Sequence, residues 1–105
     1  MTDSKSIALV LSALAHPSRV DILSCLLAHH PSGLMATFLS AETGLAPSTL
    51  SHHLREMEKG HVIKRLVNGQ RTLTHLDLRK LTEITNTLMQ LCCSIEQIPQ
   101  KGSQQ

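Results

Sequence analysis

Apolar residues in the first part of the chain recur every three or four positions, which is the spacing of an amphipathic helix. The first such stretch covers residues 5–15, and Ser4 before it is the expected N-cap. Its apolar positions are Ile7, Leu11 and Leu14. A second helix is predicted to begin at Pro17, because proline suits the first turn of a helix and disfavours helical geometry in the residue before it. Its apolar positions are Val20, Leu23, Leu26 and Leu27.

Two further helices are predicted on either side of a short turn. The third helix covers about residues 34–43 and ends at Gly44, because glycine is the usual residue after a helix. The fourth opens at Pro47 and ends at Gly60. Its apolar positions, at spacings of four and three, are Leu50, Leu54 and Met57. Two short helices joined by a three-residue turn that contains glycine form a helix-turn-helix.

The apolar period changes after the fourth helix. Residues 62–67 and 71–76 alternate imperfectly on either side of Asn68-Gly69, a strong signal for a tight hairpin turn. From Asp77 the helical period returns as a seam that would pack on another helix. The seam residues are Leu81, Ile84, Leu88, Leu91 and Ile95. The predicted fold is therefore mainly α with a β-hairpin wing: four helices, two strands and a last helix, in a winged helix-turn-helix.

Length and composition are those of a single domain with a small core. The 105 residues suit one domain over residues 1–96, and the Pro, Gly, Ser and Gln of residues 97–105 predict a flexible tail. Phe38 is the only Phe, Tyr or Trp, so the core must be aliphatic, and a thin aliphatic core favours a second copy as partner. No apolar run reaches the roughly 20 residues that span a bilayer, and no positive leader precedes the first apolar stretch. A cytoplasmic protein with no membrane partner is expected.

Positive charge is concentrated in the middle of the chain. Residues 46–75 hold five of the ten Lys and Arg residues against two of the eight acids. With its apolar side on the core, the fourth helix would present a polar face to the major groove of DNA. That face consists of Ser48, Thr49, Ser51, His52, Arg55 and Lys59. The hairpin would add contacts to phosphates from Lys64, Arg65, Gln70 and Arg71.

An alternative interpretation needs no DNA, since an amphipathic surface helix and an ordinary solvated face would carry the same charges. His53 lies at the edge of the apolar face of the fourth helix, so a packed and hydrogen-bonded histidine is expected there. An enzyme is not expected, because the chain has no Gly-rich phosphate loop and its acids and histidines are scattered. A protein-interaction module that dimerises through residues 81–95 is the alternative from another functional class.

Two long strings, LSALAHPSRVDILSCL and LAPSTLSHHLREMEKGHVIKRLVNGQRTL, resemble the ArsR/SmtB family of bacterial winged-helix repressors. Residues 15–19 look like the start of the family's second helix, and residues 48–54 look like its recognition helix. The resemblance implies a homodimer, formed by the first and last helices, that binds operator DNA and releases it on a metal, metalloid or redox signal. Ala46 departs from the family, which usually has a capping Ser or Thr there, and Ser48 is the expected substitute.

Two metal sites of that family are not expected in this chain. The family's arsenic site in the third helix has cysteines where Met35 and Thr37 stand. Its zinc site in the last helix has a ligand where Arg79 stands, and a guanidinium cannot coordinate zinc. No structural zinc is therefore expected, and no cofactor is expected to be required for folding.

The cysteines are the remaining candidates for a signal. Cys92 and Cys93 resemble a vicinal pair of some arsenic-responsive members, which implies As(III) or Sb(III) as effector. Trivalent arsenic takes three thiolates, so the third would come from Cys25, the other subunit or a small thiol. The alternative is a thiol redox or persulfide switch that uses Cys25 with Cys92 or Cys93, because adjacent cysteines in a helix make a strained disulfide. Inert cysteines, with Cys25 packed as a small hydrophobe, are the third interpretation.

Overall fold

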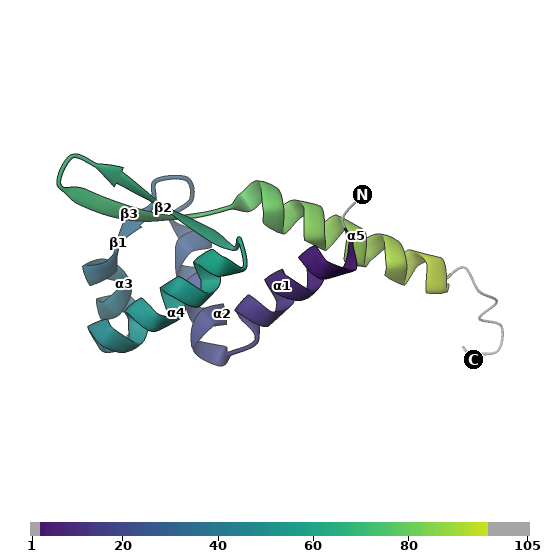
Figure 1. Ribbon diagram of the computed structural model, residues 1–105, viewed down its shortest axis with the longest axis horizontal. Coiled ribbons are helices and arrows are strands. Elements are labelled where there is room, and N and C mark those ends of the chain that lie inside the picture. The colour runs from purple at the N-terminus through teal and green to yellow at the C-terminus, as the bar shows by residue number, and fades with distance from the viewer. Residues whose placement is uncertain (1–2, 97–105) are drawn as a thin grey trace.

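The computed structural model describes residues 3–96 of the chain, with side chains up to residue 94 (Figure 1). Its elements are α1 (Ser4–Leu14), α2 (Pro17–Ala28), β1 (Leu34–Met35), α3 (Ala36–Thr43), α4 (Pro47–Lys59), β2 (Ile63–Asn68), β3 (Arg71–Leu76) and α5 (Leu78–Glu96). This order confirms the winged helix-turn-helix expected from the sequence. The predicted tail at residues 97–105 and the side chain of Ile95 lie outside the described residues.

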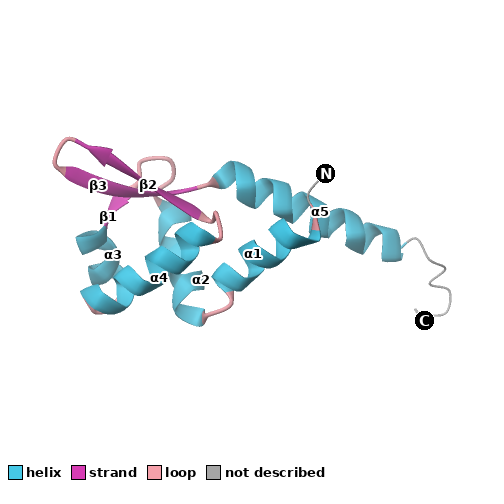
Figure 2. Cartoon of the chain, in the orientation of Figure 1, coloured by secondary structure: helices cyan, strands magenta, loops and turns pink. Residues whose placement is uncertain are grey.

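The helices stack below the sheet, and α5 leaves the sheet to extend along α1 (Figure 2). In the described part of the chain, no single helix has the length and hydropathy of a membrane span. Taken together, α1 and α2 have the length and composition of one, but they bend by 96° at their junction. Both helices contribute side chains to the core.

Side chains fix where three of the helices begin. The predicted cap at Ser4 is wrong: Asp3 is the N-cap of α1, and its Oδ1 accepts a hydrogen bond of 2.9 Å from the Ser6 N–H. That hydrogen bond is the main reason why the pKa of Asp3 is lowered. His16 caps α2 through Nδ1, and Asp77 accepts from the Lys80 N–H at the start of α5. A carboxylate at a helix N-terminus is also favoured by the helix dipole.

A third strand, absent from the sequence-based prediction, completes the sheet. Leu34 and Met35 were expected to open the third helix, but they form β1, and α3 begins only at Ala36. β1 pairs antiparallel with β3, so the strand order is β1-β3-β2. Gly33 turns the chain into β1 at φ 77°, where the ring of His75 on β3 fills the space that a Cβ would need. Pairing with a distant strand therefore overrides the helical period at these two residues.

The hairpin turn lies one residue later than predicted. Asn68 pairs with Arg71 in the ladder, so the two-residue loop is Gly69-Gln70 and not Asn68-Gly69. Gly69 has φ 69°. Among the non-glycine residues that the structure describes, only His61 has a positive φ, so φ of Gln70 is negative. A two-residue loop with glycine alone at positive φ in its first position is a type II′ turn. This shift moves Asn68 from the loop into strand β2.

The core lies between the helices and the inner face of the sheet. It consists of Val10, Ala13, Ile22, Leu26, Leu34, Leu39, Leu50, Leu54, Met57, Val62, Ile63, Leu76 and Ile84. The apolar face expected for α2 is partly wrong, because Val20 and Leu27 are exposed and Ile22 is fully buried. Every helix contributes to this aliphatic cluster, so the inner face of α4 packs against side chains from the other helices.

Candidate nucleic-acid interface

Hydroxyl groups fix the turn between α3 and α4. Gly44 ends α3 in the left-handed conformation, as expected from the sequence. Ser40 Oγ donates a hydrogen bond of 2.6 Å to the carbonyl of Leu45, and Thr43 Oγ1 accepts one from the Leu45 N–H. Thr43 also donates to the carbonyl of Leu39 within α3. The direction in which α4 leaves the turn is therefore determined by bonds at both ends of Leu45.

The two faces of α4 separate as the sequence predicts. Its buried side chains are Leu50, His53, Leu54 and Met57. All six residues predicted for recognition are exposed: Ser48, Thr49, Ser51, His52, Arg55 and Lys59. Four of the six carry hydroxyl or imidazole groups, which can both donate and accept hydrogen bonds. The outer face of α4 is therefore chemically suited to read base edges.

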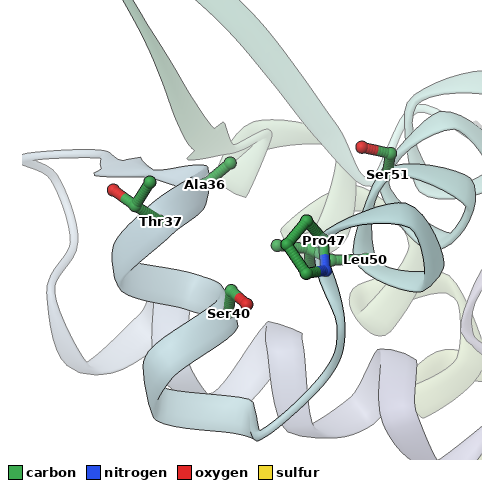
Figure 3. A pocket seen from close by; sticks show the side chains of 6 residues that line it. All are labelled: Ala36, Thr37, Ser40, Pro47, Leu50 and Ser51. Atoms are coloured by element: carbon green, nitrogen blue, oxygen red, sulfur yellow. The ribbon is translucent and has the colours of Figure 1, made fainter.

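A hollow of about 210 Å³ lies between α3 and α4 (Figure 3). Its lining residues are Ala36, Thr37, Ser40, Pro47, Leu50 and Ser51. Both helices begin beside it without a side-chain cap, since the N-caps Met35 and Ala46 make no such bond, and Ser48 does not replace it as had been expected. Backbone N–H groups in the first turn of an uncapped helix are available to water or to phosphate oxygens.

The predicted cations fall into two groups. Arg65 donates from Nε and Nη2 to Glu58 at 3.2 and 3.0 Å, and Lys59 forms an ion pair of 3.2 Å with Glu56. Arg55, Lys64 and Arg71 are exposed and form no ion pair within the described residues. Exposed ion pairs contribute only about 0–1 kcal/mol, so an incoming phosphate can compete for Arg65 and Lys59.

The tip of the wing is more apolar than the sequence suggested. Leu66 and Val67 are exposed near the end of β2, and Val67 is 76% exposed. Gln70 lies in the turn itself, and Arg71 begins the return strand. The alternation in β2 would have placed one of the two apolar residues outward, but exposure of both follows from the distance of the tip from the core. The wing therefore offers apolar contacts in addition to those of Lys64 and Arg71.

The structure places the three cysteines differently. Cys25 is half-buried in α2, whereas Cys92 and Cys93 are exposed on α5. Burial, together with the charge of Glu42, raises the pKa of the Cys25 thiol. Cys93 lines an open groove with Asn86, Met89, Gln90 and Ser94. Among the residues that the structure describes, no three His, Cys, Asp or Glu side chains are grouped as metal ligands, so Cys25 is not brought to the α5 pair as a third ligand within one protomer.

The residues predicted for dimerisation differ in how far their own protomer buries them. Ile84 is buried, and Ile7, Leu14, Leu81 and Leu88 pack partly against the same core. Ile84 was therefore wrongly placed in a contact between subunits, because its own protomer covers it. Leu11 and Leu91 remain exposed. Met89, which the seam did not include, is 58% exposed beside Leu91 at 55%.

His53 is packed and hydrogen-bonded, which confirms the expectation from its position. It is 5% exposed, and its Nδ1 accepts a hydrogen bond of 3.0 Å from Nε of Arg19. Desolvation is the largest cause that lowers the pKa of His53, followed by the charge of Arg19. Sequence reasoning found the histidine but not its partner, because Arg19 is 34 positions away.

Comparison with known proteins places this geometry among DNA-binding regulators. The sequence profile of a helix-turn-helix domain matches residues 14–65. A predicted DNA-binding transcriptional regulator from E. coli is 31% identical, with a TM-score of 0.63 over 84% of this chain and 90% of that one. An ArsR-like transcriptional regulator from Rhodococcus sp. RHA1 superposes with a TM-score of 0.79 over 93% of both chains, at 18% identity.

A third similar structure is the homodimeric winged helix-turn-helix DNA-binding domain Mb0332 from Mycobacterium bovis, a possible ArsR-family regulator. It is 21% identical, with a TM-score of 0.65 over 93% of this chain and 91% of that one. No curated protein sequence matches the chain significantly.

Proposed function

Because the chain belongs to the helix-turn-helix transcriptional regulators and has the winged-helix fold of ArsR-type proteins, we propose that it is a repressor whose homodimer binds operator DNA. The observation that carries this proposal is α4. Four side chains hold it to the core while six polar ones point outward, directly behind a turn fixed by Ser40 and Thr43. A polar helix face of this kind fits the major groove.

The contacts with DNA divide into base reading and phosphate binding. Ser51, His52 and Arg55 occupy the outer face of α4 and would contact base edges. Lys64 and Arg71 on the wing would contact phosphates and set the position of the module on the duplex. The uncapped first turns of α3 and α4 would add phosphate contacts from backbone N–H groups.

A homodimer is supported by apolar side chains that one protomer leaves uncovered. Leu11 on α1 and Met89 and Leu91 on α5 are exposed, and α5 extends past the start of α1 (Figure 1). The similar M. bovis domain is homodimeric. Two recognition helices related by a two-fold axis would read a palindromic operator with half-sites about 34 Å apart, one turn of DNA.

The proposed signal is a trivalent arsenic or antimony ion at Cys92 and Cys93. Both thiols are exposed, and thiolates are the ligands that such soft ions select. The third thiolate would come from the second protomer or from a small thiol, since Cys25 is not grouped with them. A redox or persulfide switch through Cys25 is less well supported, because its raised pKa reduces the fraction of reactive thiolate.

Fluorescence anisotropy with labelled duplex from the protein's own promoter tests the DNA-binding proposal. Affinity should fall steeply with salt, since each neutralised phosphate releases counterions. A protein that forms dimers but shows no salt-dependent DNA binding would instead be a protein-interaction module.

Arsenite titrated into the reduced complex tests the signal, with and without a monothiol. Release of DNA by wild type and by the matched control Cys25→Ser, but not by Cys92→Ser/Cys93→Ser, supports the metalloid site. Release only in the presence of the monothiol would identify the third ligand. DNA binding that is unaffected by arsenite but reversed by oxidation in wild type, and not in Cys25→Ser, would favour the redox switch.

A further inference from the structure

Arg19 occupies a position that helix stability does not explain. It lies in the first turn of α2, where a positive charge opposes the helix dipole. Its guanidinium nevertheless has two partners: Nε donates to His53 Nδ1 at 3.0 Å, and Nη1 donates to the carbonyl of Ala13 at 3.5 Å. The side chain thereby links the end of α1, the start of α2 and the middle of α4. It is a direct polar connection between the recognition helix and the helices behind it.

The hydrogen bond requires one protonation state of His53. Nδ1 can accept from Arg19 only with a free lone pair, so the ring is neutral and carries its proton on Nε2. A proton added to Nδ1 would turn this nitrogen into a donor that faces the N–H of Arg19. Because the ring is 5% exposed, little water is available to compensate for the lost bond.

The charges around His53 all act against a second proton. Arg19 from α2, His16 from the link between α1 and α2, and His52 from α4 are the groups that act on the ring. The His16 and His53 ring centroids lie 4.6 Å apart. Glu56 lies one turn further along α4 and forms an ion pair with Lys59. Its pKa is lowered mainly by Lys59, with smaller effects of His52 and Arg19. In the part of the chain that the structure describes, the groups that shift the pKa of His53 are Arg19, His16 and His52, and no acid is among them.

From this geometry we infer that Arg19 and His53 are positioning residues that hold the recognition helix α4 in its DNA-binding orientation only while His53 is neutral. Protonation of His53 from solvent breaks the bond to Arg19, releases α4 from α2 and lowers DNA affinity. The inference rests on the proposed DNA-binding function for its consequence, but the Arg19–His53 bond itself can be tested without DNA.

The sign of the pH effect follows from the unfolded chain. The pKa of His53 is lowered in the folded protein, so the unfolded state binds the proton more readily. The free energy of unfolding is therefore highest above the ordinary histidine pKa of about 6.5 and falls as the pH drops from there through the lowered value. DNA affinity depends on the free folded protein, so it should fall as the pH drops below the lowered pKa of His53, by at most about tenfold per pH unit for one linked proton.

Nitrogen NMR of ¹⁵N-histidine-labelled wild-type protein tests the bond in the absence of DNA. At pH 8 His53 should show the Nε2–H tautomer with a hydrogen-bonded Nδ1, and as the pH is lowered to pH 5 it should titrate below the ordinary histidine pKa of about 6.5. In Arg19→Gln, which keeps a donor but removes the charge, the midpoint should move to higher pH. Titration of His53 at or above the ordinary histidine pKa of about 6.5, or an Nδ1–H tautomer, would overturn the inference.

Anisotropy with promoter DNA across the same pH range tests the consequence. In His53→Asn an amide oxygen replaces the acceptor at Nδ1 and cannot titrate, so the ratio of wild-type to variant affinity should fall as the pH falls. The matched control His30→Asn should give a ratio that does not change with pH, because His30 is an exposed residue outside the proposed DNA surface. Equal pH profiles for wild type and His53→Asn would overturn the inference.

Two further readouts separate the possible failures. If none of the proteins binds DNA at any pH, the proposed function fails, while the NMR result still decides whether the Arg19–His53 bond exists. If circular dichroism shows that His53→Asn does not fold, Arg19→Gln replaces it in the DNA assay. The midpoint of its affinity profile should then move to higher pH together with that of His53, whereas a purely structural role would lower affinity without moving the midpoint.

Discussion

The helices α4 and α5 have similar apolar patterns, but the protein uses them differently. In α4 every residue of the apolar face is buried within the protomer. Among the side chains of α5 that the structure describes, up to residue 94, only Ile84 is buried, Leu81 and Leu88 are half-buried, and Leu91 is exposed. One protomer therefore buries the whole apolar face of α4 but leaves part of the apolar face of its last helix uncovered. A periodic pattern indicates that a face will be buried, but it does not say whether the same chain or another copy will bury it.

The largest effect should come from the buried face of α4. Leu54→Ala removes a side chain that is 1% exposed, and truncation of a buried leucine costs about 2–5 kcal/mol. Leu91→Ala on α5 should cost less than about 1 kcal/mol in a protein dilute enough to be monomeric, because its side chain is already half in water. Urea denaturation of the two variants at low concentration measures both values. Equal losses would mean that α5 is completed within the protomer.

The second prediction reverses the comparison by measuring association instead of folding. Met89→Ser/Leu91→Ser should weaken the dimer about 100-fold or more, since each apolar side chain buried at an interface contributes roughly 1.5–3 kcal/mol. Sedimentation equilibrium measures the dissociation constant. Val20→Ser/Leu27→Ser removes two apolar side chains of α2 that are about half exposed, slightly less than the α5 pair, and serves as the control. A dimer that is weakened by the control and not by the α5 variant would place the interface elsewhere.

Elements that depend on local contacts could be predicted from the sequence. The turn before α4 and the start of α4 are of this kind. The turn at Gly44 and the start at Pro47 depend on neighbouring residues, and both are confirmed. The strand β1 was missed because two residues form a strand only by pairing with β3, some forty positions away. The turn at Gly69-Gln70 was misplaced because the ladder bond between Asn68 and Arg71 outweighs the local preference of Asn-Gly.

The same distinction holds for the candidate site. The outward residues of α4 follow from helical period alone, and the sequence predicted all six correctly as exposed. The partners of Arg65 and His53 lie 7 and 34 positions away and on other elements, so no periodicity could indicate them. Nor could the sequence show that the half-buried Cys25 is apart from the α5 thiols, because that separation depends on how α2 packs.

The third prediction concerns the outer face of α4. Arg55→Ala should lower the affinity for promoter DNA by about 1–3 kcal/mol, because Arg55 is exposed and, within residues 3–94, forms no ion pair that DNA binding would have to break. Arg79→Ala on α5 removes an exposed arginine outside the proposed DNA surface and should change affinity little. Anisotropy at two salt concentrations measures both affinity and salt slope. A similar loss in both variants would show that the DNA lies on a different face.

The smallest effect should come from releasing a paired cation on the wing. Glu58 accepts two hydrogen bonds from Arg65, so part of the attraction of Arg65 for phosphate is cancelled in the free protein. Glu58→Gln keeps the size of the side chain but removes its charge, and exposed pairs of this kind contribute only about 0–1 kcal/mol. DNA affinity should therefore rise by no more than about fivefold, with a steeper dependence on salt because one more cation is available. Glu83→Gln, which removes the partner of Lys80 on α5, is the matched control and should leave the salt slope unchanged. If Glu58→Gln leaves affinity and salt slope unchanged, Arg65 does not approach the phosphates, and the wing acts through Lys64, Arg71 and its apolar tip.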